Sequence, residues 1–210
     1  MPLIRKPSGT PAAAPPARDA AAVLDALVTG TEDERWSAAR AAAQIPDSVA
    51  ALGEALTRET SARVREAVLT ALARIATPQS VEAVLPLLRS DDALLRTGAV
   101  DALAAMKGAA WPYLAALSRD RVADVRVLAC DLVRRMPSDE AVRIFCDLLD
   151  VETEPNVCAG AVDALAEIGS PEALPVLARC AERFRATPFL AFSIKVAVDR
   201  IRSQMSEPSA

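Results

Sequence analysis

Apolar residues recur along most of the chain at steps of three and four positions, which is the spacing of one face of an α-helix. In residues 64–75 they form one continuous stripe. Three further segments align with this one without gaps and two weaker copies keep its register: residues 95–106, 125–136, 157–168, 34–45 and 190–201. The last residues of the six segments lie 30 to 33 positions apart. The pattern predicts six copies of a helical repeat.

A second apolar segment lies before each copy. These segments are residues 23–28, 49–56, 81–88, 111–117, 141–149 and 173–180. Several follow residues that favour helix starts, namely Asp47-Ser48, Thr77-Pro78, Pro137-Ser138-Asp139 and Ser170-Pro171-Glu172. Each repeat is therefore expected to contain a first helix (helix A), a short turn and a second helix (helix B). Pro86 and Pro175 occupy equivalent places in helix A and predict a kink there.

A kinked helix A, followed by a helix B that reads V-R-x-A-x-x-A-L-x-x-I, resembles the HEAT repeat. The short period resembles the bacterial subgroup named after phycobilisome lyase subunits. The resemblance covers residues 19–203 and implies an all-α fold, a right-handed α-solenoid of about six stacked helical hairpins. A Pro/Ala-rich tail over residues 1–18 and a short tail over residues 204–210 are expected to be disordered.

The same resemblance implies a ladder of ion pairs between neighbouring repeats. The family pattern carries an acidic residue in the turn before helix B and an arginine near the start of that helix. The arginine positions are Arg35, Arg65, Arg96 and Arg126, and the acidic ones are Glu59, Asp120 and Glu152. Structural pairing is the favoured interpretation, and an arginine row that binds an anionic ligand is the alternative.

The inventory of reactive side chains is poor for an enzyme. The chain has no histidine, which removes the commonest general base and metal ligand. Its four cysteines, Cys130, Cys146, Cys158 and Cys180, form no C-x-x-C pair and fall within apolar helical patterns, so buried free thiols are expected. We therefore predict no catalytic residue, no metal site and no cofactor.

The net charge of −4 is distributed unevenly. The first eighteen residues carry Arg5, Lys6 and Arg18 without any acidic residue, so the rest of the chain is more acidic than the whole. An acidic body disfavours nucleic acid and anionic membrane as partners. The sequence shows no secretory signal and no apolar run long enough to span a bilayer, which predicts a cytoplasmic protein.

A helical wheel for helix B places two columns of residues opposite the core. One column is Trp36, Glu66, Thr97, Val127, Ala159 and Phe192, and the other is Ala43, Ala73, Ala104, Arg134, Ala166 and Asp199. In stacked hairpins the B helices line the concave side. Either alanine simply favours helix here, or a groove with a small-residue floor receives a helix or an extended peptide. The second interpretation makes Trp36, Val127 and Phe192 anchors, with Glu66 and Arg134 beside them.

Three further features bear on binding. A column beside the anchors (Arg40, Thr70, Asp101, Asp131 and Asp163) becomes acidic in the middle repeats; it is either a solvated edge or a selector of basic partners. Trp111 and Tyr113 are interpreted as packing between repeats. The opening Pro2-Leu3-Ile4-Arg5-Lys6 is either a linker or a docking motif.

Two functions from different classes follow. The first is a non-catalytic scaffold or adaptor that binds a protein partner through the concave B-helix surface, in a bacterial signalling or assembly complex. The second is a chromophore-handling subunit like those of the bilin lyases, which the repeat subgroup alone suggests. The sequence identifies neither the partner nor the oligomeric state.

Overall fold

The computed structural model describes residues 17–136, 139–168 and 170–206, which fold as twelve α-helices and two 3₁₀ segments without a strand. Contacts divide the chain into two compact units, residues 1–75 and 76–210. The helices of the first unit are α1 (Ala17–Thr29), α2 (Glu32–Ala42), α3 (Val49–Arg58) and α4 (Ala62–Ile75). Those of the second are α5 (Pro78–Val84), η1 (Leu85–Arg89), α6 (Ala93–Ala105), α7 (Lys107–Leu117), α8 (Ala123–Arg135), α9 (Asp139–Val151), α10 (Pro155–Ile168), η2 (Pro171–Ala173), α11 (Leu174–Arg183) and α12 (Pro188–Ser206).

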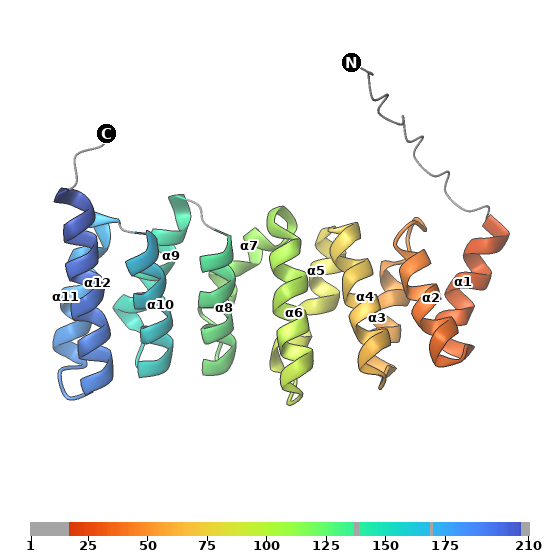
Figure 1. The fold of residues 1–210 in the computed structure, drawn as a ribbon, viewed down its shortest axis with the longest axis horizontal. Helices are drawn as coiled ribbons and strands as arrows, with labels where there is room; N and C mark the ends of the chain where they lie inside the picture. Colours follow the sequence, from red (N-terminus) through yellow and green to blue (C-terminus); the bar gives the residue numbers. More distant parts are fainter. Residues whose placement is uncertain (1–16, 137–138, 169, 207–210) are drawn as a thin grey trace, which may run out of the picture. The chain divides into compact units, whose positions relative to one another are not determined.

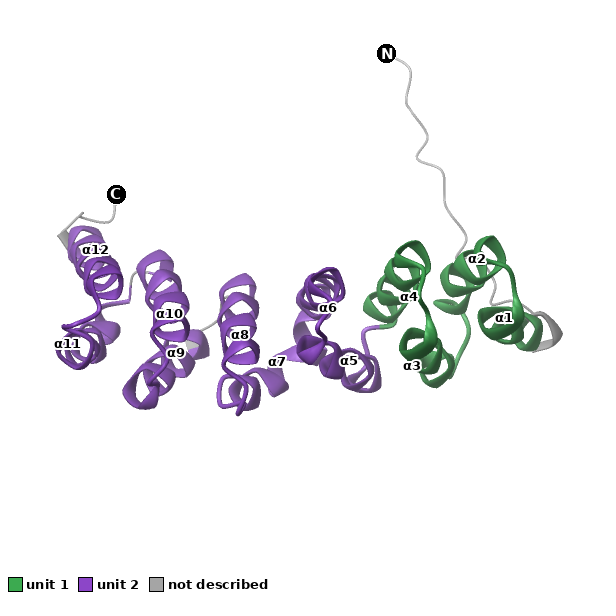
Figure 2. Cartoon of the chain, turned by 90° about the horizontal axis from the view of Figure 1, so that it is seen from below, with its two compact units in different colours: residues 1–75 green, residues 76–210 purple. Residues whose placement is uncertain are grey.

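Each unit is a stack of helical hairpins (Figure 1). In the first unit, α1 packs on α2, α3 packs on α4, and the two B helices α2 and α4 contact each other. In the second, the B helices α6, α8, α10 and α12 follow one another, each in contact with the next. Figure 2 shows α5, α9 and α11 in a separate row from these B helices. The predicted all-α fold of HEAT-like hairpins is confirmed.

Side-chain caps fix where several helices begin. Thr31 accepts from the backbone N–H of Glu34, whose carboxylate accepts in return from the N–H of Thr31, and this reciprocal pair starts α2. Thr77 and Ser80 form the same arrangement at the start of α5. Asp92 starts α6 by accepting from two backbone N–H groups. The helices therefore begin about two residues earlier than the apolar pattern alone predicts.

The core of each unit is built from the apolar stripe of the B helices. At one position of the repeat, Ala42, Leu72, Leu103, Val133 and Leu165 are all fully buried. Leu72 and Leu103 therefore occupy equivalent core positions, as the alignment of residues 64–75 with residues 95–106 predicts. Packing of this stripe against helix A, rather than helix propensity alone, stabilises segments of 10 to 14 residues such as α3 and α4.

The prolines of helix A act differently from one another. The α-helix gives way to the 3₁₀ segment η1 at Leu85, and Pro86 lies in the first turn of that segment. The prediction of an interior kink at Pro175 is wrong, because this proline lies in the first turn of α11. A proline there removes no helical hydrogen bond, since the first N–H groups of a helix have no intrahelical partner.

The predicted ends of the repeat region differ slightly from the structure. Helix α1 includes Ala17 and Arg18, and α12 continues to Ser206, so both extend into segments expected to be tails. The rest of the N-terminal segment, with the candidate docking motif Pro2-Leu3-Ile4-Arg5-Lys6, lies outside the described residues, as do residues 207–210. Among the helices that the structure describes, none is long and apolar enough to cross a membrane.

Candidate binding surface of the B helices

The five residues predicted to bind a partner lie on four B helices. Trp36 on α2 and Glu66 on α4 belong to the first unit, where α2 contacts α4 and both side chains line one groove. Val127 and Arg134 lie on α8, and Phe192 lies on α12, in the second unit. Helix α10 packs between α8 and α12, so the structure does not bring Val127 and Phe192 together.

Trp36 is less exposed than the wheel predicts. The guanidinium carbons of Arg40 and Arg63 each lie over its ring, 4.6 Å from the centroid. A cation over an aromatic face is attracted by the electron density of the ring. Trp36 is consequently half-buried under two arginines, and it holds these side chains in place rather than standing open as a bare anchor.

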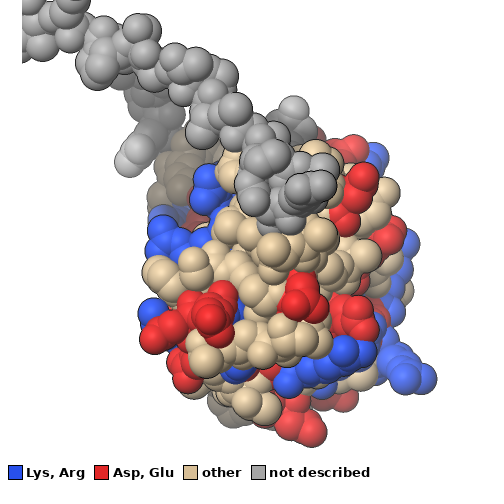
Figure 3. Space-filling view, turned by 90° about the vertical axis from the view of Figure 1, so that its right-hand side faces the viewer, with Lys and Arg blue, Asp and Glu red and all other residues tan. Residues whose placement is uncertain are grey.

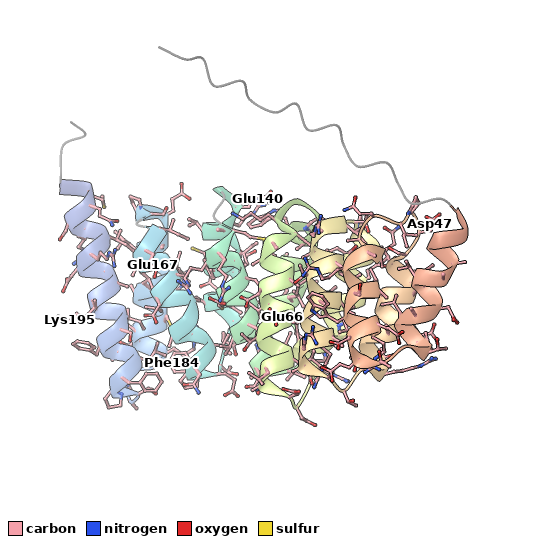
Figure 4. The ribbon with its side chains drawn as sticks, turned by 45° about the vertical axis from the view of Figure 1, so that its right-hand side comes forward. Asp47, Glu66, Glu140, Glu167, Phe184 and Lys195 are labelled. Carbon is pink, nitrogen blue, oxygen red and sulfur yellow. The ribbon has the colours of Figure 1, made fainter. Side chains whose placement is uncertain are left out.

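A groove of about 340 Å³ runs beside Trp36 between α2 and α4. Its floor is made of the small residues Ala43, Ala67 and Ala71, and its charged side chains are three arginines and one glutamate: Arg40, Arg63, Arg74 and Glu66. Glu66 is exposed and is labelled in Figure 4. Of the predicted floor only Ala43 lines this groove, because Ala67 and Ala71 come from the buried stripe and Ala73 does not line it. The groove carries an excess of positive charge.

In the second unit, exposed apolar side chains mark the B-helix surface. Phe192 is 69% exposed and Val127 is 36% exposed. The sequence interpretation missed Phe189 and Val196, which are also exposed and lie on the same face of α12 as Phe192. Phe189, Phe192 and Val196 are three, four and seven positions apart, and this helical spacing could have predicted that they share a face. The other predicted column is more enclosed than expected, because Ala166 is buried where α10 packs closely on its neighbours.

Arg134 is already paired within the protein. It donates to Asp131 over 2.7 Å and forms an ion pair of 3.5 Å with Glu167, which Figure 4 labels on α10. The hydrogen bond to Asp131 raises the pKa of Arg134. Arg135, also on α8, forms ion pairs with Asp131 of the same helix and with Asp101 of α6. Two carboxylates of the column beside the anchors are thus neutralised internally, which favours the solvated-edge interpretation over a selector of basic partners.

The implied arginine ladder is confirmed at two places. Arg35 binds Glu59 through two hydrogen bonds of 2.7 and 3.1 Å, and Arg126 binds Glu152 through two of 2.6 and 2.9 Å. Each glutamate also accepts from two backbone N–H groups of the turn that follows it. Asp120 departs from the pattern, because it pairs with Arg89 instead of Arg96.

These arginines also close the turn before their own helix. Arg35, Arg65, Arg96 and Arg126 each donate to a backbone carbonyl five or six residues earlier. These hydrogen bonds favour structural pairing over an anion-binding arginine row at these positions.

On helix A, polar side chains bridge successive repeats of the second unit. Trp111 donates its indole N–H to Glu140 over 2.7 Å, and Tyr113 donates its hydroxyl to Glu82 over 2.9 Å. Arg119 pairs with Asp147, and Arg179 with Asp150. The interpretation of Trp111 and Tyr113 as packing between repeats is confirmed. These contacts join neighbouring A helices, as the ion pairs of Arg134 and Arg135 join neighbouring B helices.

A comparison with protein-family models identifies HEAT repeats over residues 19–104, 49–126 and 110–186. The chain belongs to the HEAT-repeat family. A comparison with curated proteins finds no match.

Solved structures of other repeat proteins resemble this HEAT-repeat chain. An archaeal HEAT-like repeats protein from Thermococcus onnurineus NA1 is 17% identical, with a TM-score of 0.52 over 89% of this chain and 88% of that one. Human deoxyhypusine hydroxylase in complex with glycerol is 20% identical, with a TM-score of 0.47 over 90% of this chain and 75% of that one. A chain in the complex of CpcE and CpcF of phycocyanin lyase from Nostoc sp. PCC7120 is 14% identical, with a TM-score of 0.39 over 96% and 99%. At these identities the likeness concerns the fold alone.

The cysteines of the HEAT-repeat chain are free thiols, of which Cys130, Cys158 and Cys180 are buried and Cys146 is half-buried. Burial raises the pKa of Cys130 to about 12, so its thiol is protonated at neutral pH and is a poor nucleophile. Within the described residues, no group of three or more Cys, Asp or Glu side chains is placed to hold a metal ion.

Proposed function

We propose that the protein is a non-catalytic scaffold or adaptor that binds a protein partner through its B-helix surface. The observation that carries this proposal is the contrast between the two helix rows of the second unit. Among the described residues of this unit, the A helices expose one large apolar side chain, Val151, whereas the B helices expose several, among them Val127 and Phe192. Large apolar side chains on an otherwise solvated face commonly serve as anchors in an interface.

The family and the chemistry of the chain support this proposal. Stacked helical repeats present an extended surface for recognition, and their exposed columns can change without loss of the core. Histidine is absent from the sequence, and the buried Cys130 thiol is protonated at neutral pH. We place the protein in a signalling or assembly complex of the bacterial cytoplasm, a reducing compartment in which free thiols such as these persist.

The test compares two surfaces with the same substitution. Val127→Asp puts a charge on the B-helix surface, and Val151→Asp puts the same charge on helix α9, where Val151 is 73% exposed. Val151 is far more exposed than Val127, so the melting temperature of each variant is measured too, and a loss of binding counts only where that temperature is unchanged. We expect Val127→Asp to weaken binding of a captured partner by about tenfold or more and Val151→Asp to leave it unchanged. The reverse result would move the interface to helix A and contradict the proposal.

The bilin-lyase-like alternative makes a separate prediction. A chromophore-handling subunit should develop a stable visible absorbance band after incubation with a bilin and gel filtration. A scaffold should emerge without colour. No observation on the described helices favours the alternative, because the likeness to a phycocyanin lyase chain does not extend beyond the fold.

A further inference from the structure

The groove between α2 and α4 combines positive charge with a small apolar floor. Of its charged side chains, Arg40 and Arg74 form no ion pair with any residue that the structure describes. Arg40 instead lies over Trp36, and a guanidinium stacked on a ring keeps its N–H groups free at its edges. Arg63 is stacked on the same ring and donates to Asp33, which is itself largely exposed.

Stacking on one ring limits the distance between two guanidinium groups. Because the guanidinium carbons of Arg40 and Arg63 each lie 4.6 Å from the same centroid, they are no more than about 9 Å apart. In an extended peptide, side chains two positions apart point the same way and are separated by about 7 Å. Two carboxylates at alternate positions of an extended peptide can therefore reach both arginines.

From this geometry we infer that the groove binds an extended acidic segment of a protein partner, with Asp or Glu at alternate positions. The segment lies along Ala43, Ala67 and Ala71, where the small floor admits a peptide backbone close to the helices. Its carboxylates accept from Arg40 and Arg63, and a further one reaches Arg74. The inference rests on the proposed function and names the chemistry of the partner at one part of the B-helix surface.

The positive charge is confined to the groove, which favours an acidic peptide over a nucleic acid as the ligand. The whole chain is acidic, with a net charge of −4. On the face that Figure 3 shows, basic and acidic side chains form small separate groups around an uncharged area. A nucleic acid needs a broad basic field along its backbone, whereas an acidic peptide needs only a few well-placed donors.

The experiment uses the full chain and two fluorescein-labelled peptides of equal composition. One alternates Glu and Ala over twelve residues, and the other arranges the same residues as Glu-Glu-Ala-Ala blocks, in which alternate positions are never both acidic. Fluorescence anisotropy should show the alternating peptide binding about tenfold or more tightly than the block peptide. On a Trp111→Phe background, where Trp36 is the remaining tryptophan, binding should also change the tryptophan fluorescence.

Single substitutions locate the site. Arg40→Gln and Arg74→Gln should each weaken binding of the alternating peptide by about tenfold, because each removes a charge-assisted hydrogen bond. Arg58→Gln is the matched control, since Arg58 lies on α3 of the same unit outside the groove. It should leave the affinity unchanged.

Several outcomes would overturn the inference. They are equal affinity for the two peptides, tighter binding of a Lys-Ala peptide or of a twelve-nucleotide single strand, full competition by millimolar inorganic phosphate, and insensitivity to Arg40→Gln. If the acidic peptide fails while Val127→Asp still weakens partner capture, the scaffold function stands and only the chemistry assigned to this groove is wrong. If Val127→Asp has no effect on partner capture while the peptide binds at Arg40, the inference about the groove holds and the proposed binding surface on the B helices of the second unit is wrong.

Discussion

Glu152 offers the sharpest test of how neighbouring repeats are held together. Its carboxylate accepts two hydrogen bonds from Arg126 and two from the backbone N–H groups of Thr153 and Glu154. The pair is enclosed, with 14% of the Arg126 side chain and 4% of the Glu152 side chain exposed. In Glu152→Ala the buried Arg126 guanidinium keeps only its hydrogen bond of 2.8 Å to the carbonyl of Asp120. The backbone N–H groups of Thr153 and Glu154 lose the carboxylate that accepts from them.

We expect this substitution to lower the free energy of unfolding by about 3–5 kcal/mol, the usual result of removing one partner from a buried ion pair. Glu152→Gln keeps an oxygen for the two backbone N–H groups but loses the charge, so it should cost less, about 1.5–3 kcal/mol. Glu182→Ala is the control, because Glu182 forms an exposed pair with Arg185 in which both side chains are more than three-quarters exposed. It should barely change stability.

The pH dependence gives a second measure of the same contact. Burial raises the pKa of Glu152, but the hydrogen bonds from Arg126 and from the backbone of Glu154 and Thr153 outweigh it, so the pKa lies below the ordinary 4.5. The unfolded chain then takes up the proton first as the pH falls. The stability that Glu152 contributes is complete above pH 4.5 and is lost as the pH falls through the lower folded-state pKa. The stability difference between wild type and Glu152→Gln should therefore shrink over that range.

Urea unfolding followed by far-ultraviolet circular dichroism measures these differences, with a second probe to check that the repeats unfold together. The reasoning is refuted if Glu152→Ala is no more destabilising than Glu182→Ala. It is also refuted if the difference between wild type and Glu152→Gln does not change between pH 6 and pH 3.

Two further predictions concern the core and the backbone. Leu72→Ala and Leu103→Ala remove fully buried side chains at equivalent positions and should each lower the free energy of unfolding by about 2–5 kcal/mol in urea titrations; losses below about 0.5 kcal/mol would contradict the helical register. Ala76 follows α4 with a φ of 52°, a conformation that favours glycine, so Ala76→Gly should raise the free energy of unfolding by about 0.5–1 kcal/mol. Asp47 has a φ of 60°, but Asp tolerates this conformation better than Ala, so Asp47→Gly should raise the free energy of unfolding by less than Ala76→Gly. An equal or larger increase for Asp47→Gly would contradict the explanation by backbone conformation.

The repeat and its core could be predicted because they depend on local order. A stripe with a period of 3.6 residues specifies which face of each helix is buried, and its recurrence in register specifies which helices stack. The ladder pairs Arg35–Glu59 and Arg126–Glu152 follow the same register. The helix starts were predicted less well, since hydrogen bonds such as those of Thr31 and Asp92, rather than apolar spacing, decide them.

The binding surface was harder to predict because it depends on side-chain positions between helices. A wheel places Trp36 opposite the core, but it does not show that Arg63, on another helix, covers the ring. It likewise shows Arg134 as exposed without showing that Asp131 and Glu167 already hold it. Pro175 was misinterpreted because its distance from the start of α11 depends on the short segment η2 before it.

Site-specific photo-crosslinking tests the central claim most directly. A benzophenone side chain is placed in turn at Glu66 and Val127 on the B helices, and at Glu54 and Val151 on the A helices, four exposed positions with no part in the core. The account predicts that one and the same partner is crosslinked from Glu66 and Val127, and that the two A-helix positions give no crosslink to it. Crosslinks to that partner from Glu54 and Val151, with none from Glu66 and Val127, would contradict the account.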